Sequence, residues 1–454
     1  MGDIYVAGSD HRTNSALYFL KNGDDTLTYV GDARAASEEV ANWQPAETAE
    51  KFHVRPTFFR GRVYVATSDY SRADGGYLKR RGFHWYAYDE GNRQLVDLSS
   101  VEPGGVGGAH ASIFALAVDA KNGLLYGHDS PRGHLYRYDI EKGKTTNLGR
   151  PSSLPEGFYM PGRYIWVNRD GRVYFTISKC EYVQYYDPHT GFGERKDVSI
   201  SDQRYPNNVF RTGTRSLDGR YVWVADREAH IWRYDDATDK FAYLGQAVGE
   251  GARNNSKTTL KIRCFNVSAD GKKLYLINDD AQECCLWEYD LISQKTQKLC
   301  ALGEFDERLG AKEYINHCGN DTWDGVGNFY FCSFGGDTSE STDLIFSRLN
   351  PVRMKVSLGI LPEYVEVSAK PLIGGRCIIE RTGSTKRAQD VIIKEVHSEL
   401  AQPRFCTFTI PAGEQSVEIP QMLMGVQPVT FTVMGNGNDY CAARANPCEV
   451  KIDD

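Results

Sequence analysis

The segment LLYGHDSPRGHLYRYDIEKGKTTNLG, residues 124–149, contains the repeating unit that decides the fold. Its second half, residues 135–149, reads as an aromatic-rich strand ending in Tyr-Asp, a polar turn, and a strand closing on Leu-Gly. Period-two alternation of apolar and polar residues is typical of strands whose two faces differ. Six further copies lie at residues 17–31, 84–98, 183–197, 231–245, 286–300 and 345–359. The pattern therefore predicts a fold built from repeated hairpins.

A second hairpin precedes six of the seven copies, and its turn is usually Asp-Gly or Asn-Gly, as in residues 121–129 and 217–225. These dipeptides supply the positive φ angles that a tight hairpin turn needs. Two hairpins in about 45–50 residues make one four-stranded blade, and radial repetition of blades hides the sheet edges. We therefore expect an all-β fold with a seven-bladed β-propeller over residues 1–360. The first unit lacks an inner strand, which a later segment would supply.

One tyrosine recurs at a similar place in most of the repeats. The recurring residues are Tyr64, Tyr126, Tyr174, Tyr275 and Tyr330. A residue present in nearly every blade is more simply explained by packing than by catalysis. We therefore expect these side chains in the core.

The pattern changes after about residue 360, where strand-like alternations are separated by Gly, Asn and Pro turns. These features predict a small β-sandwich over residues 361–454. The segments IERTGST (379–385), TIPAGEQSVEIP (409–420) and VKIDD (450–454) resemble a Calx-β module. Some such modules bind calcium through acidic clusters, and this segment lacks them. We expect a packing or spacer role for it.

Composition narrows the classes of partner. The chain has 454 residues, 41% of them hydrophobic, and a net charge of -7, so a large folded core is expected and nucleic acid is a poor partner. No stretch approaches the roughly 20 apolar residues of a membrane span, so we expect no membrane partner. The first residues, MGDIYV, lack the features of a signal peptide.

Polar residues gather where a propeller places its cleft. The loops before the inner strands and after the second strands of a propeller converge on one face. In register, His53 and His110 precede inner strands, His128 ends a second strand, and Tyr159 follows His110 by about one repeat. The later blades add Tyr205, Asn207, Asn208, Arg211, Arg227 and His317 at corresponding positions.

These residue types suit β-elimination at a uronic acid. The reaction needs a cation to neutralise the carboxylate and acidify the adjacent C–H, a base, and an acid for the leaving oxygen. Arginine binds carboxylates in bidentate fashion, and histidine titrates near neutral pH. Neither a GxSxG elbow nor a Gly-rich phosphate loop is present.

Three segments carry a resemblance to a known family. Residues 50–71, 80–91 and 124–151 resemble the propeller-type ulvan lyases and their relatives that act on rhamnose-glucuronate linkages. The resemblance covers roughly residues 1–360. It implies a secreted or periplasmic lyase acting on an acidic polysaccharide or oligosaccharide, with no cofactor required for catalysis.

The resemblance also implies roles for individual residues. His110 and His128 match the family's histidine pair, and Tyr159 matches its tyrosine. His110 or Tyr159 would take the C5 proton, and His128 would help to bind the carboxylate. The family's arginine has no counterpart one strand after Tyr159, so Arg211 and Arg227 are the candidates. The substrate-binding set would be His53, Tyr205, Asn208 and Arg227.

Two other functions remain open at this stage. A related glycoside hydrolase acts on rhamnose-α-1,4-glucuronate with a histidine on the opposite face, for which His11 or His84 would be the counterpart. A non-catalytic glycan-binding propeller would keep the cleft without needing a base.

The cysteines and one histidine of the later repeats predict a candidate metal site. The chain has 11 cysteines, an odd number, so at least one thiol is unpaired within the chain. Cys264, His317, Cys318 and Cys332 fall on neighbouring blades, and sulfur with imidazole is a zinc-like ligand set. A structural zinc is therefore one expectation, with buried thiols that bind no metal as the alternative. A structural calcium is also open, although the C-terminal segment lacks the acidic clusters that would bind it.

Overall fold

The computed structural model covers the whole chain, and most of its residues can be described. The exceptions are residues 1–2, 10–13, 22–23, 46, 69–79, 152–153, 156, 201–207, 249–259, 261, 269, 279–284, 305–321, 324–327, 336–342, 359–364, 373–375, 398–403, 420–428, 435–440, 444–447 and 451–454.

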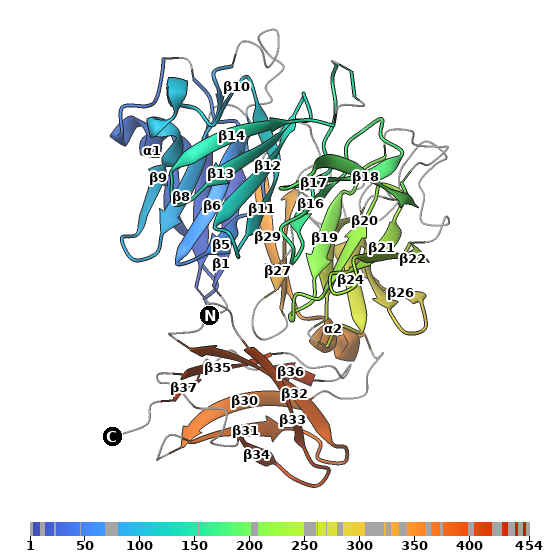
Figure 1. Ribbon diagram of the computed structural model, residues 1–454. Helices are drawn as coiled ribbons and strands as arrows, with labels where there is room; N and C mark the ends of the chain where they lie inside the picture. Colours follow the sequence, from blue (N-terminus) through green and yellow to red (C-terminus); the bar gives the residue numbers. More distant parts are fainter. Residues whose placement is uncertain are drawn as a thin grey trace.

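The described chain is all-β and propeller-like, because antiparallel sheets of sequential strands follow one another along residues 4–349 (Figure 1). The first sheet contains β1 (Ile4–Ser9), β2 (Ser15–Leu20) and β3 (Thr28–Asp32). The second contains β4 (Lys51–Phe52), β5 (Thr57–Phe59), β6 (Arg62–Ser68), β8 (Trp85–Asp89) and β9 (Gln94–Asp97). The third contains β11 (Ser112–Asp119), β12 (Leu124–Ser130), β13 (Leu135–Asp139) and β14 (Lys144–Gly149).

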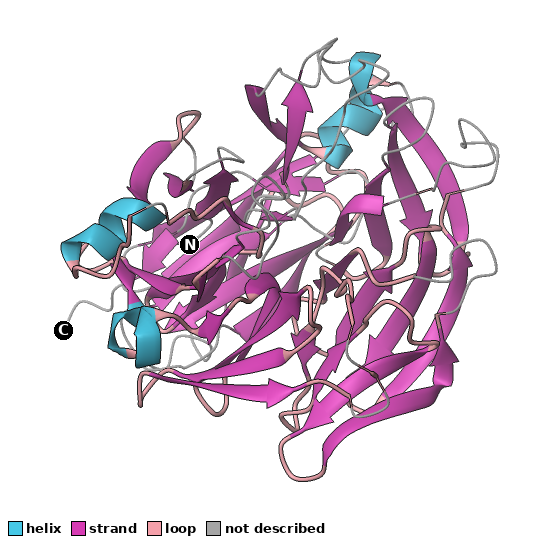
Figure 2. Ribbon diagram, turned by 90° about the horizontal axis from the view of Figure 1, so that it is seen from above, coloured by secondary structure: helices cyan, strands magenta, loops and turns pink. Residues whose placement is uncertain are grey.

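The later sheets repeat this order. The fourth contains β15 (Trp166–Val167), β16 (Val173–Phe175), β17 (Tyr182–Asp187) and β18 (Gly191–Ser199). The fifth contains β19 (Thr212–Arg215), β20 (Tyr221–Ala225), β21 (His230–Asp235) and β22 (Lys240–Gln246). The sixth contains β23 (Ile262–Val267), β24 (Lys273–Asn278), β25 (Cys285–Asp290) and β26 (Lys295–Ala301). The seventh contains β27 (Thr322–Trp323), β28 (Phe329–Gly335) and β29 (Asp343–Leu349). Figure 2 shows the strands of successive sheets standing side by side.

Short elements connect these sheets. Helix α1 (Ala33–Glu39) follows β3, and its first turn is capped by the Asp32 carboxylate, which accepts from the Ala35 amide. Strands β7 (Gly82–Phe83) and β10 (Gly108–Ala109) pair with each other. Three 3-10 turns lie at Leu98–Val101, Pro103–Gly105 and Leu302–Glu304.

The turn chemistry explains the hairpins. Gly219 and Gly271, in the Asp-Gly turns before β20 and β24, have φ angles of 74° and 69°. In the turn before β6, Arg60 and Gly61 have φ angles of 49° and 75°. Positive φ at these positions matches the twist of the two strands that each turn joins.

The seventh copy of the repeat departs from the prediction. A strand was expected to close residues 345–359, but the chain after β29 forms helix α2 (Pro351–Ser357). The Asn350 side-chain oxygen accepts from the amides of Val352 and Arg353, and proline at the first position suits a helix start. The Asn-Pro sequence therefore starts a helix at the position where the other repeats have a polar turn between two strands.

The recurrent tyrosines lie in the core, as expected. The exposed fractions of Tyr64, Tyr126, Tyr174, Tyr275 and Tyr330 are between 0% and 4%. They pack in apolar clusters or between neighbouring sheets, as with Tyr126 against Tyr186 at 6.4 Å. Burial of such large rings is a main source of stability for the repeats.

The C-terminal residues form two further sheets, which lie below the others in Figure 1. One contains β30 (Val365–Leu372), β31 (Arg376–Thr382), β34 (Ser416–Ile419) and β36 (Cys441–Ala443). The other contains β32 (Gln389–His397), β33 (Arg404–Ile410), β35 (Val429–Met434) and β37 (Cys448–Val450). Both sheets contribute to one apolar cluster, which includes Val367, Ile379, Val391, Ile393 and Val433. Helix α2 lies against this part, since Arg353 pairs with Glu366 at 2.5 Å.

Replacing Arg381 with alanine is expected to destabilise the C-terminal part. The buried guanidinium of Arg381 donates to the carbonyls of Glu414, Arg387, Thr385 and Pro411. Arg381→Ala removes all of these charge-assisted hydrogen bonds at once and leaves the carbonyls without their donor. We therefore expect the free energy of unfolding to fall by about 2–4 kcal/mol.

Denaturant titration of the full chain would measure this loss. Arg381→Lys is the matched variant, because lysine keeps the charge but cannot reach several carbonyls in one plane. It should recover only part of the stability. An unchanged midpoint for Arg381→Ala would refute the assigned role.

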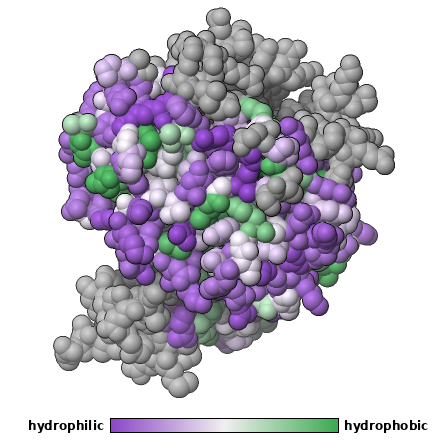
Figure 3. Space-filling model, turned by 45° about the horizontal axis from the view of Figure 1, so that its top comes forward, coloured by the Kyte–Doolittle hydropathy of each residue, from purple (hydrophilic) through white to green (hydrophobic). Residues whose placement is uncertain are grey.

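The surface is polar over most of the face drawn in Figure 3, where hydrophobic areas are small and scattered. Within the described ranges, none of the helices has the length and apolar character of a membrane span.

Candidate functional site

The predicted catalytic and substrate-binding residues that can be described lie in the strands of the second to fifth sheets or in the loops next to them. His53 directly follows β4, and its ring stacks on Phe114 of β11 with ring centroids 4.0 Å apart. Its Nδ1 lies 3.1 Å from the Phe114 carbonyl oxygen. Since a carbonyl only accepts, Nδ1 carries the proton, and Nε2 is the nitrogen that can take up another.

The surroundings of His53 are cationic. Burial, followed by the positive charges of Arg163, Lys51 and Arg211, lowers the pKa of His53 well below its ordinary value. His53 is therefore neutral at physiological pH. An anionic ligand bound here would lie near one neutral imidazole and near arginine side chains from the segments before β15 and β19.

His110 has an unusual backbone and an exposed side chain. Its φ is 58°, in the left-handed region that non-glycine residues rarely adopt. The backbone is held there by two contacts: the amide donates to the Arg81 carbonyl, and Nδ1 lies 2.6 Å from the Arg80 carbonyl. As with His53, Nδ1 is the donor, so the neutral ring presents Nε2 as a proton acceptor.

The loop after β12 joins His110 to Tyr159. Arg132 donates to the carbonyl of Ala109, next to His110, and the Tyr159 amide donates to the Pro131 carbonyl. Tyr159 is buried, and its hydroxyl donates to the Pro155 carbonyl at 2.9 Å. The ring lies beneath Lys179 Nζ at 4.8 Å. The structure thus brings Tyr159 close to the His110 segment, with its hydroxyl already hydrogen-bonded to backbone.

The expected role of His128 is corrected by its burial. Its imidazole is 0% exposed and packs edge-on against Phe175 at 4.8 Å. Burial lowers its pKa to about 3. A neutral ring inside the protein cannot bind a polysaccharide carboxylate, so His128 is a core residue in this conformation.

Asn208 and Arg227 meet at the fifth sheet. The Asn208 side chain donates to Asp226 at 2.6 Å and accepts from the Arg227 amide. The Arg227 guanidinium contacts the sulfur of Met160 at 2.8 Å, one residue after Tyr159. The amide of Arg211 donates to the Ala225 carbonyl in the same region. Arg227 therefore connects Asn208, before the fifth sheet, with Met160, before the fourth sheet.

Several predicted residues lie outside the described part of the chain. These are His11, Tyr205, Asn207, His317 and Cys318. Of the expected zinc ligands, Cys264 and Cys332 remain, and they pack against different apolar clusters. Among described residues, no group of three or more His, Cys, Asp or Glu side chains could hold a metal. The zinc and calcium expectations remain predictions.

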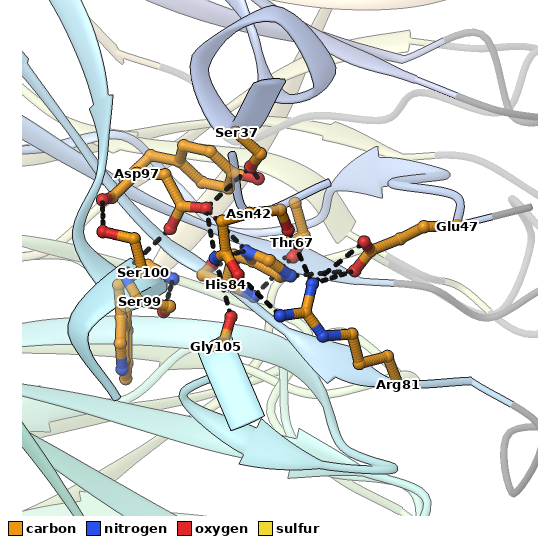
Figure 4. Close-up of polar contacts among 12 residues, drawn as sticks. Ser37, Asn42, Glu47, Thr67, Arg81, His84, Asp97, Ser99, Ser100 and Gly105 are labelled. Carbon is orange, nitrogen blue, oxygen red and sulfur yellow. Dashed lines mark hydrogen bonds and ion pairs between the residues drawn. The ribbon is translucent and has the colours of Figure 1, made fainter. Parts of the chain in front are cut away.

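His84 lies in a buried polar network, here called the His84 clamp: His84, Glu47, Asp97, Asn42 and Arg81 (Figure 4). Nδ1 of His84 lies 2.9 Å from Asp97, and Nε2 lies 2.9 Å from Glu47. Burial alone would lower the pKa of His84, but the hydrogen bonds to Asp97 and Glu47 raise it. With both nitrogens bonded and 3% exposure, His84 cannot reach a glycosidic oxygen. The hydrolase role expected for His84 is therefore wrong for this conformation.

The His84 clamp gives a pH-dependent stability. The raised pKa of His84 contributes stability below its unfolded pKa, and this is lost as pH rises through the folded pKa. The lowered pKa values of Glu47 and Asp97 contribute stability above their unfolded pKa, which is lost as pH falls through the folded values. We expect the stability difference between the native protein and His84→Gln to be largest at about pH 5–6.

Thermal melts of both proteins across pH would check this. His189→Ala, in an exposed turn, is the matched control and should follow the native curve. A difference that does not vary with pH would contradict a charged His84.

Two residues near the site were missed in the sequence. Arg163 contributes to the field at His53, and its place before β15 parallels that of Arg211 before β19, which was the available signal. Asp129 follows His128 and is fully buried, and burial raises its pKa to about 7. Its Oδ2 lies 3.6 Å from Arg132 Nε. No sequence pattern distinguished Asp129 from the many other acidic residues.

The fold defines an all-β, propeller-like protein, in which the site residues His84, His128, Arg211 and Arg227 are buried and His110 is exposed. No protein-family model matches the chain, and no curated protein matches it. A candidate 6-phosphogluconolactonase from Bacteroides uniformis has 10% identity and a TM-score of 0.47, covering 76% of this chain and 96% of its own. One from Bacteroides fragilis has 10% identity and a TM-score of 0.45, covering 77% and 95%. None of these similarities bears on what the site does.

Proposed function

We propose that this protein is a polysaccharide lyase that cleaves next to glucuronic or iduronic acid, with rhamnose as the neighbouring sugar. The observation that carries the proposal is an anchored imidazole, His53, beside arginines, together with a second anchored and exposed imidazole, His110. His110 and His53 each bind a carbonyl through Nδ1 and present Nε2 as the acceptor. Arg163 and Arg211 supply positive charge beside His53.

The proposed chemistry follows from these groups. An arginine, with Arg211 and Arg227 as the leading candidates, neutralises the uronate carboxylate and so acidifies the adjacent C–H. Nε2 of His110 takes the C5 proton, because this side chain is exposed. The C4–O bond breaks, a C4–C5 double bond forms, and the leaving oxygen gains a proton. Tyr159 is the second candidate for proton transfer, but its buried hydroxyl donates to the Pro155 carbonyl, so it can act only in a conformation that releases this hydrogen bond.

The proposal includes a complete architecture: a seven-bladed propeller over residues 1–360 and a Calx-β-like sandwich over residues 361–454. Contacts between the first and last sheets support ring closure. Ile4 and Val6 of β1 share an apolar cluster with Tyr330 of β28. Arg348 of β29 pairs with Asp25, between β2 and β3, at 2.6 Å. A secreted or periplasmic location belongs to the same proposal, because the substrate is an extracellular glycan.

The products separate the candidate reactions. The protein is incubated with a rhamnose-glucuronate oligosaccharide in heavy-oxygen water, and the products are weighed by mass spectrometry. Elimination leaves an unsaturated uronate without incorporated water oxygen, as proposed. Both reactions release the sugar attached at O4, so the uronate product decides. Hydrolysis leaves a saturated uronate, heavier by one water than the elimination product, and would replace the lyase by the hydrolase. Intact substrate that is retained by the protein would indicate a glycan-binding propeller.

A further inference from the structure

We infer that the His84 clamp is a positioning element for His110, and that it holds His110 in place while His84 is protonated. The effect on catalysis rests on the proposed function, whereas the link between the His84 clamp and His110 rests on the contacts alone. It concerns residues that do not themselves reach the exposed face.

The first step links the clamp to the segment before β7. Arg81 donates to both the side-chain and main-chain oxygens of Asn42, and to Glu47 at 3.0 Å. Asn42 in turn donates to Asp97 at 2.8 Å. Residues 80–81 are therefore linked to the two carboxylates that His84 bridges. Arg81 also donates to the Gly104 carbonyl, and the next residue, Gly82, pairs with Ala109.

The second step links that segment to His110. The carbonyls of Arg80 and Arg81 are the two groups that hold the ring and the amide of His110. A left-handed backbone at a non-glycine residue is unfavourable and persists only where contacts determine it. Since these two carbonyls hold the ring and the amide of His110, a shift of residues 80–81 would move its Nε2.

The third step is the charge of His84. A protonated imidazole donates from both nitrogens and can satisfy Glu47 and Asp97 together, whereas a neutral one donates from only one. Deprotonation therefore leaves one carboxylate facing a lone pair. The charged and titratable groups that face His84 are Glu47 before β4, Asp97 at the end of β9, Arg81 across Glu47, and Tyr86, whose ring stacks at 5.9 Å.

Histidine NMR provides a readout that does not need the enzyme to be a lyase. The full chain is labelled at the histidine rings, and the His84 and His110 signals are assigned from single variants. We expect the His110 signals to show a second inflection at the midpoint of His84. In Glu47→Gln this inflection should move down by about 1 pH unit or more, because an opposite charge is removed. His189→Ala should leave both midpoints unchanged.

Kinetics then tests the functional meaning. Glu47→Gln should lower kcat with little change in KM. The alkaline limb of the pH profile of kcat should shift together with the titration midpoint of His84. The inference would be overturned if the His110 signals showed a single inflection that does not change in Glu47→Gln. This outcome does not depend on which reaction the protein catalyses. Coupled inflections without any unsaturated product would leave the clamp intact and refute the proposed function instead. If His84→Gln fails to fold, Glu47→Gln and Asp97→Asn, which are nearly isosteric, serve for both measurements.

Discussion

Replacing His110 with asparagine is expected to lower the rate of unsaturated product formation by about 10²–10⁴-fold, the usual contribution of a positioned base. Asparagine tolerates the left-handed backbone, where φ is 58°, and its amide can donate to the Arg80 carbonyl. The variant should therefore fold as the native protein does while lacking Nε2. Initial rates with a rhamnose-glucuronate polymer would measure the effect.

The controls separate catalysis from folding. His189→Ala removes an exposed histidine outside the site and should keep the full rate. The circular dichroism spectrum and melting temperature of His110→Asn should match those of the native protein. Full activity in a folded His110→Asn protein would remove His110 from the mechanism and leave Tyr159 and His53 as bases.

Replacing Asp239 with alanine is expected to cost about 2–4 kcal/mol of unfolding free energy, because several buried donors lose one acceptor together. Asp239 lies between β21 and β22 but serves the fourth sheet as well. Its carboxylate accepts from the hydroxyls of Tyr174 and Tyr234, and from Arg172 and Arg195 at 3.0 and 2.9 Å. It therefore joins two neighbouring sheets.

Chemical denaturation would measure this loss. Asp239→Asn keeps a residue that tolerates the local φ of 51° but removes the charge, so it should fall between the native protein and the alanine variant. Lys240→Ala, the exposed neighbour, should change stability little. An Asp239→Ala protein as stable as the native one would show that the two sheets are held by apolar packing alone.

The repeat pattern predicted most of the fold, because turn residues and alternation act locally. The hairpin expected at residues 231–245 is β21 and β22, and its Tyr234 is buried as the alternation requires. The prediction for residues 345–359 was wrong because Asn350 and Pro351 start a helix. A strand was expected there only because the segment is similar to the other copies of the repeat.

The site was harder to predict than the fold. Register along the repeats placed Asn208 and Arg227 in contiguous positions, since equivalent strand ends lie on one face. It could not show which way a side chain points. Successive side chains of a strand face opposite sides, so His128, within β12, faces Phe175 in the interior. The His84 clamp joins residues that lie between Asn42 and Asp97 in the sequence through tertiary contacts that no local pattern encodes.

Ultraviolet absorbance during incubation with ulvan and, separately, with rhamnose-capped arabinogalactan shows whether the protein eliminates at the uronate. A C4–C5 double bond beside the uronate carboxylate absorbs in the ultraviolet, whereas the saturated substrate does not. We predict a steady rise with at least one polymer that is abolished in His110→Asn. A flat trace with both polymers, from a folded protein, would contradict the lyase.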